Sequence, residues 1–208
     1  ADAYNIKGAI WVDVRCPREY NKGHFPDSIN IPLFSDYQYE DIGKTYKKSG
    51  QEVAIELGLE HAETSKNSIL EKLLSLKSKK IIIYCARGGM RSKGFEELSH
   101  EAGYKTLRID GGYKSIRNHV LDSFISPRKI IIVAGSTGTG KTSLLHKMKE
   151  QKLGVIDLEK LASHRGSAFG DIGLADQPTQ QQFENNLSSE WQSTNKNHPV
   201  FIESESRR

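Results

Sequence analysis

One cysteine in the sequence lies in a loop whose composition favours a reactive thiolate. Cys85 follows an apolar run at residues 80–84 and precedes Arg87, two glycines and Arg91. Glycines let the backbone N–H groups of such a loop converge on one anion, and a helix that begins there adds positive potential. The same field lowers the pKa of a thiol and makes it a nucleophile. We therefore predict that Cys85 is the catalytic thiol and that Arg87 and Arg91 hold an oxyanion. The rest of this anion-binding loop is Ala86, Gly88, Gly89 and Met90.

The charge near Cys85 is locally basic, although the chain as a whole is almost balanced. The 208 residues include 30 Lys and Arg against 26 Asp and Glu, a formal net charge of +4. Between residues 77 and 93, six side chains are basic and none is acidic: Lys77, Lys79, Lys80, Arg87, Arg91 and Lys93. The overall excess permits nucleic-acid binding without requiring it, whereas the local window favours an anionic substrate.

The composition is typical of a soluble globular protein. Hydrophobic residues make up 36% and charged residues 27%, which excludes a disordered or fibrous chain. No apolar run approaches the roughly 18 residues of a membrane span. The two cysteines, Cys16 and Cys85, cannot form a disulfide scaffold and indicate a reducing cytoplasm. Cys16 has no partner motif, so we expect it to take no part in the chemistry.

A second chemical motif lies near residue 140. The pattern Gly-x4-Gly-Lys-Ser/Thr is formed by Gly135, Ser136, Thr137, Gly138, Thr139, Gly140, Lys141 and Thr142. It follows an apolar run at residues 129–133 and opens a helical pattern at residues 141–150, which is the context of a P-loop. Backbone N–H groups of such a loop cradle phosphates, Lys141 pairs with their charge, and Thr142 can bind Mg²⁺.

Four further side chains are candidates for a second site around the P-loop. Asp157 and Glu203 each end an apolar strand and could hold Mg²⁺ or its water ligands. His164 and Arg165 begin a glycine-containing segment that could contact phosphate or RNA. The sequence favours neither carboxylate over the other.

These motifs need elements that position them, and the apolar pattern predicts strands alternating with helices. Strands are expected at residues 9–14, 28–31, 80–84, 106–109, 129–133, 154–157 and 199–203. Helices are expected at residues 53–59, 68–76, 92–102 and 141–150, and a loop at residues 166–182. Such alternation indicates an α/β fold with parallel sheets.

The segment around Pro127 predicts a hinge between two domains, at residues 1–126 and 127–208. Only 81 residues follow Pro127, and they contain three expected strands. A nucleotide-binding α/β core usually has about five strands. We therefore expect the second domain to be the N-terminal part of a P-loop NTPase-like α/β domain, and the chain to be a fragment.

The first domain resembles the rhodanese-family sulfurtransferases. The matching segments are Asp13-Val14-Arg15, Glu19-Tyr20, Gly23-His24-Phe25-Pro26, Ile29-Asn30-Ile31-Pro32 and Gly111-Gly112-Tyr113. The resemblance covers residues 9–120 and implies a rhodanese-like domain built on a parallel sheet. Within it we expect structural roles for Asp13, Arg15, Glu19 and His24.

The loop from Cys85 to Arg91, the expected active loop, departs from the common sulfurtransferase pattern. Five residues separate Cys85 from Arg91, one more than in that pattern and the same number as in the Cys-x5-Arg signature of cysteine phosphatases. A wider loop suits a tetrahedral anion that contains phosphorus better than a bare sulfur atom. A phosphatase fused to a kinase-like domain and a thiosulfate sulfurtransferase therefore stay open as alternatives. A non-catalytic signalling module is disfavoured because the nucleophile is present.

Nearly the whole chain resembles the bacterial tRNA 2-selenouridine synthases, which combine a rhodanese domain with a P-loop domain. The matching segments are residues 43–47, 54–59, 85–92, 111–114, 135–142, 157–159, 164–170, 177–178, 183–184 and 203–207. The resemblance implies a transferase that replaces the sulfur of wobble 2-thiouridine by selenium from selenophosphate. It also implies S-geranylation of that sulfur from geranyl diphosphate as an associated activity.

The resemblance divides the chemistry between the two motifs. Cys85 would be the thiolate for chalcogen transfer, either carrying selenium covalently or assisting the displacement of geranyl thiol. Arg87 and Arg91 would hold selenophosphate. The P-loop would bind a diphosphate, which is that of geranyl diphosphate or of a nucleotide.

The resemblance also implies tRNA and a selenophosphate supply enzyme as partners. It establishes no tightly bound cofactor, and Mg²⁺ and a nucleotide at the P-loop stay open. Phosphate contacts need only point charges. The candidates for contacts with tRNA are Lys47, Lys48, Lys114, Arg117, Arg128, Lys129 and Arg165.

Overall fold

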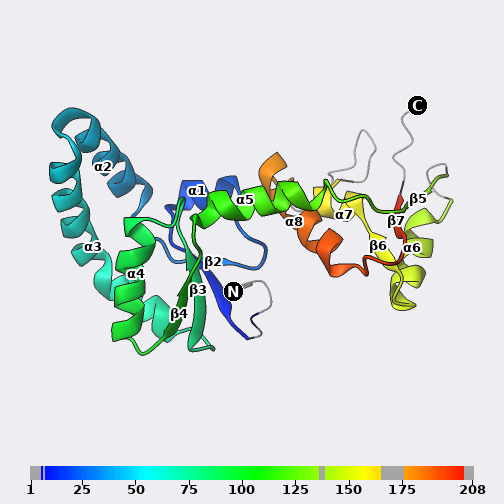
Figure 1. Ribbon diagram of the computed structural model, residues 1–208, viewed down its shortest axis with the longest axis horizontal. Coiled ribbons are helices and arrows are strands. Elements are labelled where there is room, and N and C mark those ends of the chain that lie inside the picture. The colour runs from blue at the N-terminus through cyan, green and yellow to red at the C-terminus, as the bar shows by residue number, and fades with distance from the viewer. Residues whose placement is uncertain (1–5, 7, 136–138, 165–175, 204–208) are drawn as a thin grey trace. The chain divides into compact units, whose positions relative to one another are not determined.

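The computed structural model describes residues 6, 8–135, 139–164 and 176–203 (Figure 1). The chain forms two compact units, residues 1–117 and 118–208, which are described separately. The boundary falls within helix α5 (Gly112–Ser123), ahead of the expected hinge at Pro127. Among the residues described, no helix has both the length and the apolar character that crossing a membrane would require.

The first unit is built on a four-stranded parallel sheet. Its strands are β1 (Ile10–Asp13), β2 (Ile29–Asn30), β3 (Lys80–Tyr84) and β4 (Lys105–Arg108), in the order β2-β1-β3-β4. The last four residues of β3 are buried, because this central strand is covered on both faces. The fold class expected from the sequence is therefore confirmed.

The two faces of β3 pack against different helices. Ile81 and Ile83 join a core cluster with Leu73 and Phe95, from helices α3 (Gln51–Leu74) and α4 (Met90–Glu101). Tyr84 belongs to a separate cluster on α5. The carboxyl end of β3, where ligands of parallel sheets usually bind, is thus fixed from both sides.

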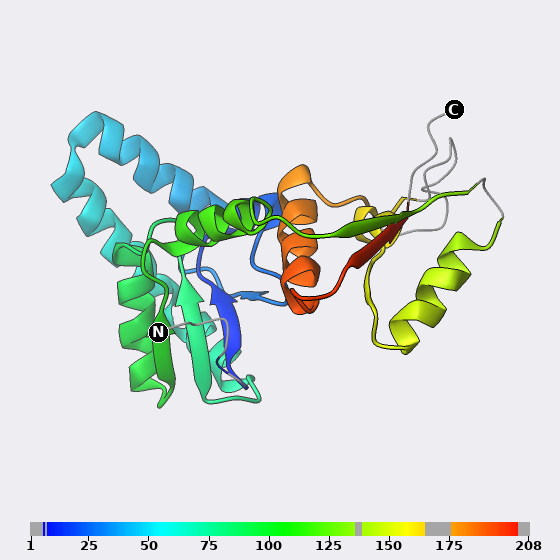
Figure 2. The same cartoon turned by 45° about the vertical axis from the view of Figure 1, so that its right-hand side comes forward.

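The remaining helices of the first unit are α1 (Pro17–Lys22) and α2 (Asp36–Ser49). Helices α2 and α3 form a helical hairpin that turns at Gly50, and Figures 1 and 2 show the two helices side by side. Gly50 has a φ of +89°, a conformation that favours glycine.

Two sequence expectations about these helices were wrong. Helix α3 is continuous, where two short helices at residues 53–59 and 68–76 were expected; the polar residues between them lack apolar periodicity but do not break a helix. Helix α2 was not expected, although Tyr39, Ile42 and Tyr46 recur at the spacing of one helical face, because most of the residues between them are polar.

The second unit has a smaller sheet. Its strands are β5 (Ile130–Val133), β6 (Gly154–Ile156) and β7 (Val200–Glu203), all parallel and in the order β5-β7-β6. They occur where the sequence predicted strands. The helices of this unit, besides the end of α5, are α6 (Lys141–Glu150), α7 (Leu158–Ala162) and α8 (Gln180–Ser193).

Helix α8 corrects the expectation of a loop at residues 166–182. Residues 166–175 of that range lie outside the described part of the chain, and α8 begins at Gln180. Its first turn is a run of glutamines without apolar spacing, which concealed the helix. Farther along, Trp191 packs with Ile156 and Val200 in the core of this unit.

Candidate active site

The Cys85 loop leaves the carboxyl end of β3 and is anchored by the first turn of α5. The N–H group of Tyr113 donates to the carbonyl of Cys85 at 2.8 Å, and that of Lys114 donates to the carbonyl of Ala86 at 3.0 Å. These two bonds occupy loop carbonyls on the α5 side and so fix the path of the loop backbone.

Two glycines make this close approach of α5 possible. Gly112 has a φ of +57°, and a side chain there would overlap the Cys85 carbonyl and the N–H groups of Arg87 and Gly88. Gly88 has a φ of +70°, and a Cβ atom there would lie 3.0 Å from the backbone nitrogen of Gly111. The glycine pair after β4 therefore packs directly against the Cys85 loop, a role that the sequence indicated only as a family motif.

The Cys85 side chain is buried and bonded to the helix that follows the loop. The thiol is 3% exposed and donates to the Ser92 Oγ at 3.3 Å, and the Ser92 hydroxyl donates to the Gly89 carbonyl at 3.0 Å. Burial acts to raise the pKa of Cys85. The Ser92 hydroxyl, the N–H groups of Arg87 and Ser92, and the charge of Arg91 outweigh burial and lower the pKa below its ordinary value.

Ser92 is a candidate functional residue that the sequence prediction left out. It lies directly after Arg91 and is fully buried against the thiol. Its position after the Cys-x5-Arg spacing was the available signal. When Cys85 ionises, the hydroxyl can turn to donate to the sulfur, which stabilises the thiolate.

The two arginines of the loop differ in their surroundings. Arg91 donates to both carboxylate oxygens of Glu19, at 2.6 and 3.3 Å, and its guanidinium lies 4.9 Å from the centre of the Tyr39 ring. Arg87 is exposed and forms no ion pair with any residue in the described ranges. Arg87 is consequently the loop cation that is available to an incoming anion.

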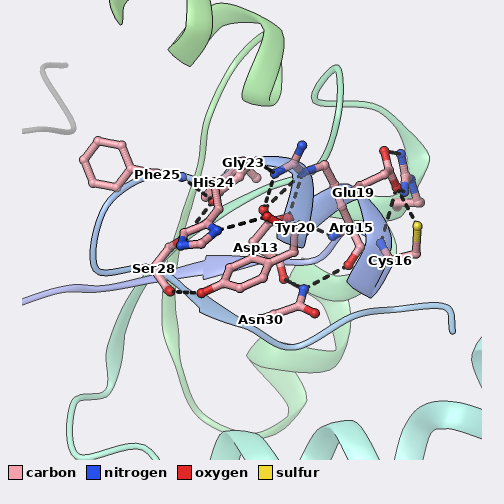
Figure 3. Close-up of polar contacts among 12 residues, drawn as sticks. Asp13, Arg15, Cys16, Glu19, Tyr20, Gly23, His24, Phe25, Ser28 and Asn30 are labelled. Atoms are coloured by element: carbon pink, nitrogen blue, oxygen red, sulfur yellow. Dashed lines mark hydrogen bonds and ion pairs between the residues drawn. The ribbon is translucent and has the colours of Figure 1, made fainter. Parts of the chain in front are cut away.

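Glu19 connects the active loop to the turn that follows β1. Burial acts to raise its pKa, but the hydrogen bonds and charge of Arg91 lower it below the ordinary value. The same carboxylate accepts from the thiol of Cys16 at 3.2 Å (Figure 3). The expected structural role of Glu19 thus extends to an ion pair with a residue of the active loop.

Cys16 is chemically different from Cys85. It is fully buried, and burial together with the Glu19 carboxylate raises the pKa of its thiol to about 12. At neutral pH such a thiol is protonated and unreactive. This environment agrees with the expectation that Cys16 takes no part in the chemistry.

The other motif residues of the first unit hold the β1 turn together. Arg15 is bound to Asp13 at 2.6 Å and to the carbonyl of Gly23 at 2.7 Å (Figure 3). Its guanidinium also lies 3.8 Å from the ring centre of Tyr113, the residue that donates to Cys85. His24 stacks on Tyr20 with ring centres 3.8 Å apart.

The P-loop of the second unit connects β5 to α6, as the sequence predicted. Gly140, the residue before α6, has a φ of +83°, and the Lys141 ammonium donates to the carbonyl of Gly135 at 2.8 Å. Thr139 is described and exposed. Ser136, Thr137, Gly138 and the side chain of Thr142 lie outside the described residues.

Carboxylates lie at the ends of the strands next to this loop. Glu203 is 4% exposed, and its Oε2 has no hydrogen-bond partner within the described ranges. Burial, a hydrogen bond with Glu159 and the charge of Asp157 raise the pKa of Glu203 to about 7, while Lys141 opposes the rise. This buried, unpartnered oxygen is chemically suited to a divalent cation.

The other second-site candidates are placed less directly. The Asp157 carboxylate caps α7 by accepting from the N–H group of Lys160 at 2.9 Å. His164 follows α7, and Arg165 lies outside the described residues. Among the residues that can be described, no group of three or more His, Cys, Asp or Glu side chains is arranged to hold a metal ion.

One of the cations expected to contact tRNA has a structural role. The Arg128 guanidinium donates to the carbonyls of Trp191 and Asn195, at 2.6 and 2.8 Å, and stacks on the Trp191 ring. It thereby satisfies carbonyls at the end of α8. Lys47 and Lys48, in contrast, are exposed in the last turn of α2.

The fold and the thiol loop together define a class. Residues 1–119 match the family model of the rhodanese-like domain, and the chain belongs to that family. Residues 128–208 match the model described as the tRNA 2-selenouridine synthase AAA domain. The resemblance of the whole chain to tRNA 2-selenouridine synthases is therefore confirmed.

Individual relatives agree with both matches. The chain is 38% identical to a tRNA 2-selenouridine synthase of Nitrosomonas europaea over 94% of its own length and 53% of the relative. It is 42% identical to a synthase of the same name from Shewanella frigidimarina over 85% of its length and 49% of the relative. The chain thus spans about half the length of the curated relatives it matches.

A solved structure is also similar. It is the N-terminal domain of a Clostridium difficile 630 protein assigned as an ATP/GTP binding protein. The identity is 37%, the TM-score is 0.53, and the match covers 57% of this chain and 94% of the other.

Proposed function

We propose that the protein acts in the conversion of wobble 2-thiouridine of tRNA into 2-selenouridine. The observation that carries this proposal is the Cys85 thiol, held 3.3 Å from Ser92 with a lowered pKa. It lies in the rhodanese-like part of a chain whose remainder matches a selenouridine synthase domain. A stabilised thiolate is the group that chalcogen-transfer chemistry requires.

Selenophosphate is the proposed selenium donor, bound at the Cys85 loop. Arg87 is exposed and supplies the cation, and the N–H groups of the loop supply further donors to the phosphate oxygens. Arg91 is held by Glu19, so it acts as a positioning residue whose charge also favours the thiolate. A selenophosphate supply enzyme is accordingly a proposed partner.

The P-loop is the proposed site for the diphosphate of geranyl diphosphate. Lys141 and the N–H groups at the start of α6 would bind the diphosphate, and Glu203 would help to hold Mg²⁺ there. In the geranylation step the thiouridine sulfur forms a bond to C1 of the geranyl group. The C1–O bond breaks, diphosphate leaves with its electron pair, and the base loses its N3 proton to solvent. A nucleotide at the same loop is the alternative.

Selenation then exchanges the chalcogen on the base. The selenium of selenophosphate forms a bond to C2 of the base, the C2–S bond breaks, and sulfur leaves as geranyl thiolate, which takes up a proton. Water cleaves the Se–P bond and releases phosphate. Cys85 assists the departure of the geranyl thiolate, a role in which selenium keeps the oxidation level that it has in selenophosphate. Lys47 and Lys48 are among the proposed contacts to the tRNA backbone.

Mass spectrometry of wobble uridine in tRNA tests this function. We expect 2-selenouridine to disappear when the gene is deleted, to return with the wild-type gene, and not to return with Cys85→Ala. Lys141→Ala should abolish geranylation if geranyl diphosphate binds at the P-loop, whereas retained geranylation would indicate a nucleotide there. Unchanged selenouridine in the deletion strain would refute the proposal.

One observation favours a cysteine phosphatase as a second candidate. The Cys-x5-Arg spacing of Cys85 and Arg91 is followed by Ser92 in contact with the thiol. Incubation of the purified chain with an aryl phosphate distinguishes the two candidates. Release of phosphate that is lost in Cys85→Ser would support the phosphatase.

A further inference from the structure

A cavity of about 590 Å³ lies between α2, α3 and α4 of the first unit. Its walls are mostly aliphatic and aromatic, and include Leu33, Phe34, Ile42, Ala54, Ile55 and Leu98. The volume falls within the range of small-molecule sites, roughly 300–1,000 Å³. Neither the geranylation step nor the selenation step proposed for this protein uses the cavity.

The cavity adjoins the Cys85 loop. Met90 and Arg91, at the end of that loop, line the cavity, and the Met90 side chain is 61% exposed. Leu33 and Phe34 belong both to the cavity wall and to the core cluster that contains Cys85. A ligand in the cavity would therefore lie next to the end of the loop that carries the thiol.

The charges around the cavity exclude an anion as its occupant. Lys66 is paired with Glu101 at 3.0 Å, and Arg91 is paired with Glu19. The other charged residues of the lining, Glu63 and Glu97, are carboxylates. A diphosphate would find no available cation here, whereas an uncharged hydrocarbon gains from leaving water.

We propose that this cavity binds the hydrocarbon chain of an S-prenylated thiouridine, the geranyl thioether, while its base is presented to the Cys85 loop. The inference rests on the proposed function, and it separates two roles. The P-loop holds the diphosphate before transfer, and the cavity holds the chain after transfer. A short, branched and uncharged chain attached to sulfur is the occupant that fits both the apolar wall and the neighbouring thiol.

Gly58 provides a test because it lies in α3 and faces the cavity. A Cβ atom there would contact Ile42 Cδ1 and Phe34 Cζ at 3.8 Å each, an ordinary packing distance. Gly58→Ala should therefore fit, whereas Gly58→Leu would fill the cavity. Both replacements favour a helix over glycine, so neither is expected to unfold α3. Ala62→Leu, one turn farther along α3, is a second filling variant.

The experiment measures binding of the nucleoside S-geranyl-2-thiouridine by titration calorimetry, with S-methyl-2-thiouridine for comparison. We expect the wild-type chain and Gly58→Ala to bind the geranyl nucleoside at least about tenfold more tightly than the methyl one. Gly58→Leu and Ala62→Leu should lose this preference while Cys85 alkylation stays at the wild-type rate. Equal binding of the two nucleosides by the wild type, or an unchanged preference in both filling variants, would overturn the inference.

Two further readouts separate the possible failures. Sedimentation of wild type and Gly58→Leu checks whether a second copy of the chain occupies the cavity, and a dimer lost in that variant would overturn the inference. Wobble 2-selenouridine that depends on Cys85 but is unaffected by Gly58→Leu would reject the cavity and retain the proposed function. Tighter binding of the geranyl nucleoside without Cys85-dependent 2-selenouridine would retain the cavity as a binding site and reject the proposed function.

Discussion

Arg91 and Glu19 form a bidentate ion pair, with guanidinium–carboxylate distances of 2.6 and 3.3 Å. The two residues are 72 positions apart in the sequence, and both side chains are mostly buried. The pair joins the end of the active loop to the turn after β1. The position of Arg91 therefore depends on a segment that contributes no nucleophile.

Removing Arg91 should be more damaging than removing both members of this pair. Arg91→Ala leaves the Glu19 carboxylate without its partner, and we expect a loss of about 2–4 kcal/mol in the free energy of unfolding of the first unit. The double variant Glu19→Gln/Arg91→Ala should recover part of that loss. Urea unfolding of the two single variants and the double variant measures the coupling. If the double variant lost as much free energy of unfolding as the two single variants combined, the pairing of Glu19 and Arg91 would be contradicted.

The two cysteines should differ in reactivity across the pH range. Cys85 has a lowered pKa, whereas that of Cys16 is raised to about 12. The thiolate is the reactive form, so the alkylation rate of Cys85 should reach its plateau at a lower pH than that of a free thiol. We expect iodoacetamide at pH 7 to label the folded chain once. Labelling should disappear in Cys85→Ser and persist in Cys16→Ser, as mass spectrometry would show.

Ser92 should be needed for the low pKa of Cys85. Ser92→Ala removes the hydroxyl that can donate to the thiolate, and the alkylation rate at pH 7 should fall about tenfold, with its pH profile moved upward. Ser99 is the matched control, since it is also fully buried in α4 but donates to the Phe95 carbonyl. If Ser92→Ala and Ser99→Ala react at the same rate, Ser92 does not tune the thiol.

Gly112 should not tolerate even a methyl group. Gly112→Ala would force α5 away from the Cys85 loop, and we expect a loss of more than about 2 kcal/mol in stability together with slower alkylation of Cys85. Gly43→Ala is the control, because a Cβ atom there meets nothing within 4 Å. Thermal unfolding and alkylation kinetics of the two variants make the comparison, and a stable, fully reactive Gly112→Ala would contradict the close approach.

Glu203 should make the second unit less stable as the pH rises. Its pKa is raised from 4.5 to about 7, so the folded state binds the proton more tightly than the unfolded state does. The stabilisation is complete below pH 4.5 and is lost as the pH rises to about 7. Glu203→Gln should remove this fall in the free energy of unfolding between pH 5 and pH 8, which urea unfolding measures. Glu150→Gln is the control: Glu150 is exposed at the end of α6, and its replacement should leave the fall unchanged. Identical pH profiles for wild type and Glu203→Gln would exclude Glu203 as the cause.

Much of the fold could be predicted because its strands are short apolar runs with polar ends. Residues 80–84 indicated both a buried strand and the loop that must follow it, and the glycine pattern ending at Lys141 indicated the P-loop. Helix α2 was missed although Tyr39, Ile42 and Tyr46 have helical spacing, because most of the residues between them are polar. Its hairpin with α3 nevertheless forms two walls of the cavity.

The candidate site was predicted where its residues are neighbours in the sequence. The lowered pKa of Cys85 follows from a local loop and the start of a helix, both of which are readable from the sequence. The Glu19–Arg91 pair and the fit of Gly112 against Cys85 depend on segments that only the tertiary structure brings together. Neither could be predicted from spacing, and both determine where the loop lies.

The parallel arrangement of the first sheet has a consequence for the order of folding. Ile10 on β1 pairs with Ile81 on β3, and Lys80 on β3 pairs with Lys105 on β4, so no strand of this sheet pairs through a simple hairpin. Chains dominated by such distant pairings fold slowly, because loops must close before contacts form. The Cys85 environment requires β3, α4 and α5 to be in place at once. The rate of thiol alkylation during refolding should therefore report the last stage of folding of this unit.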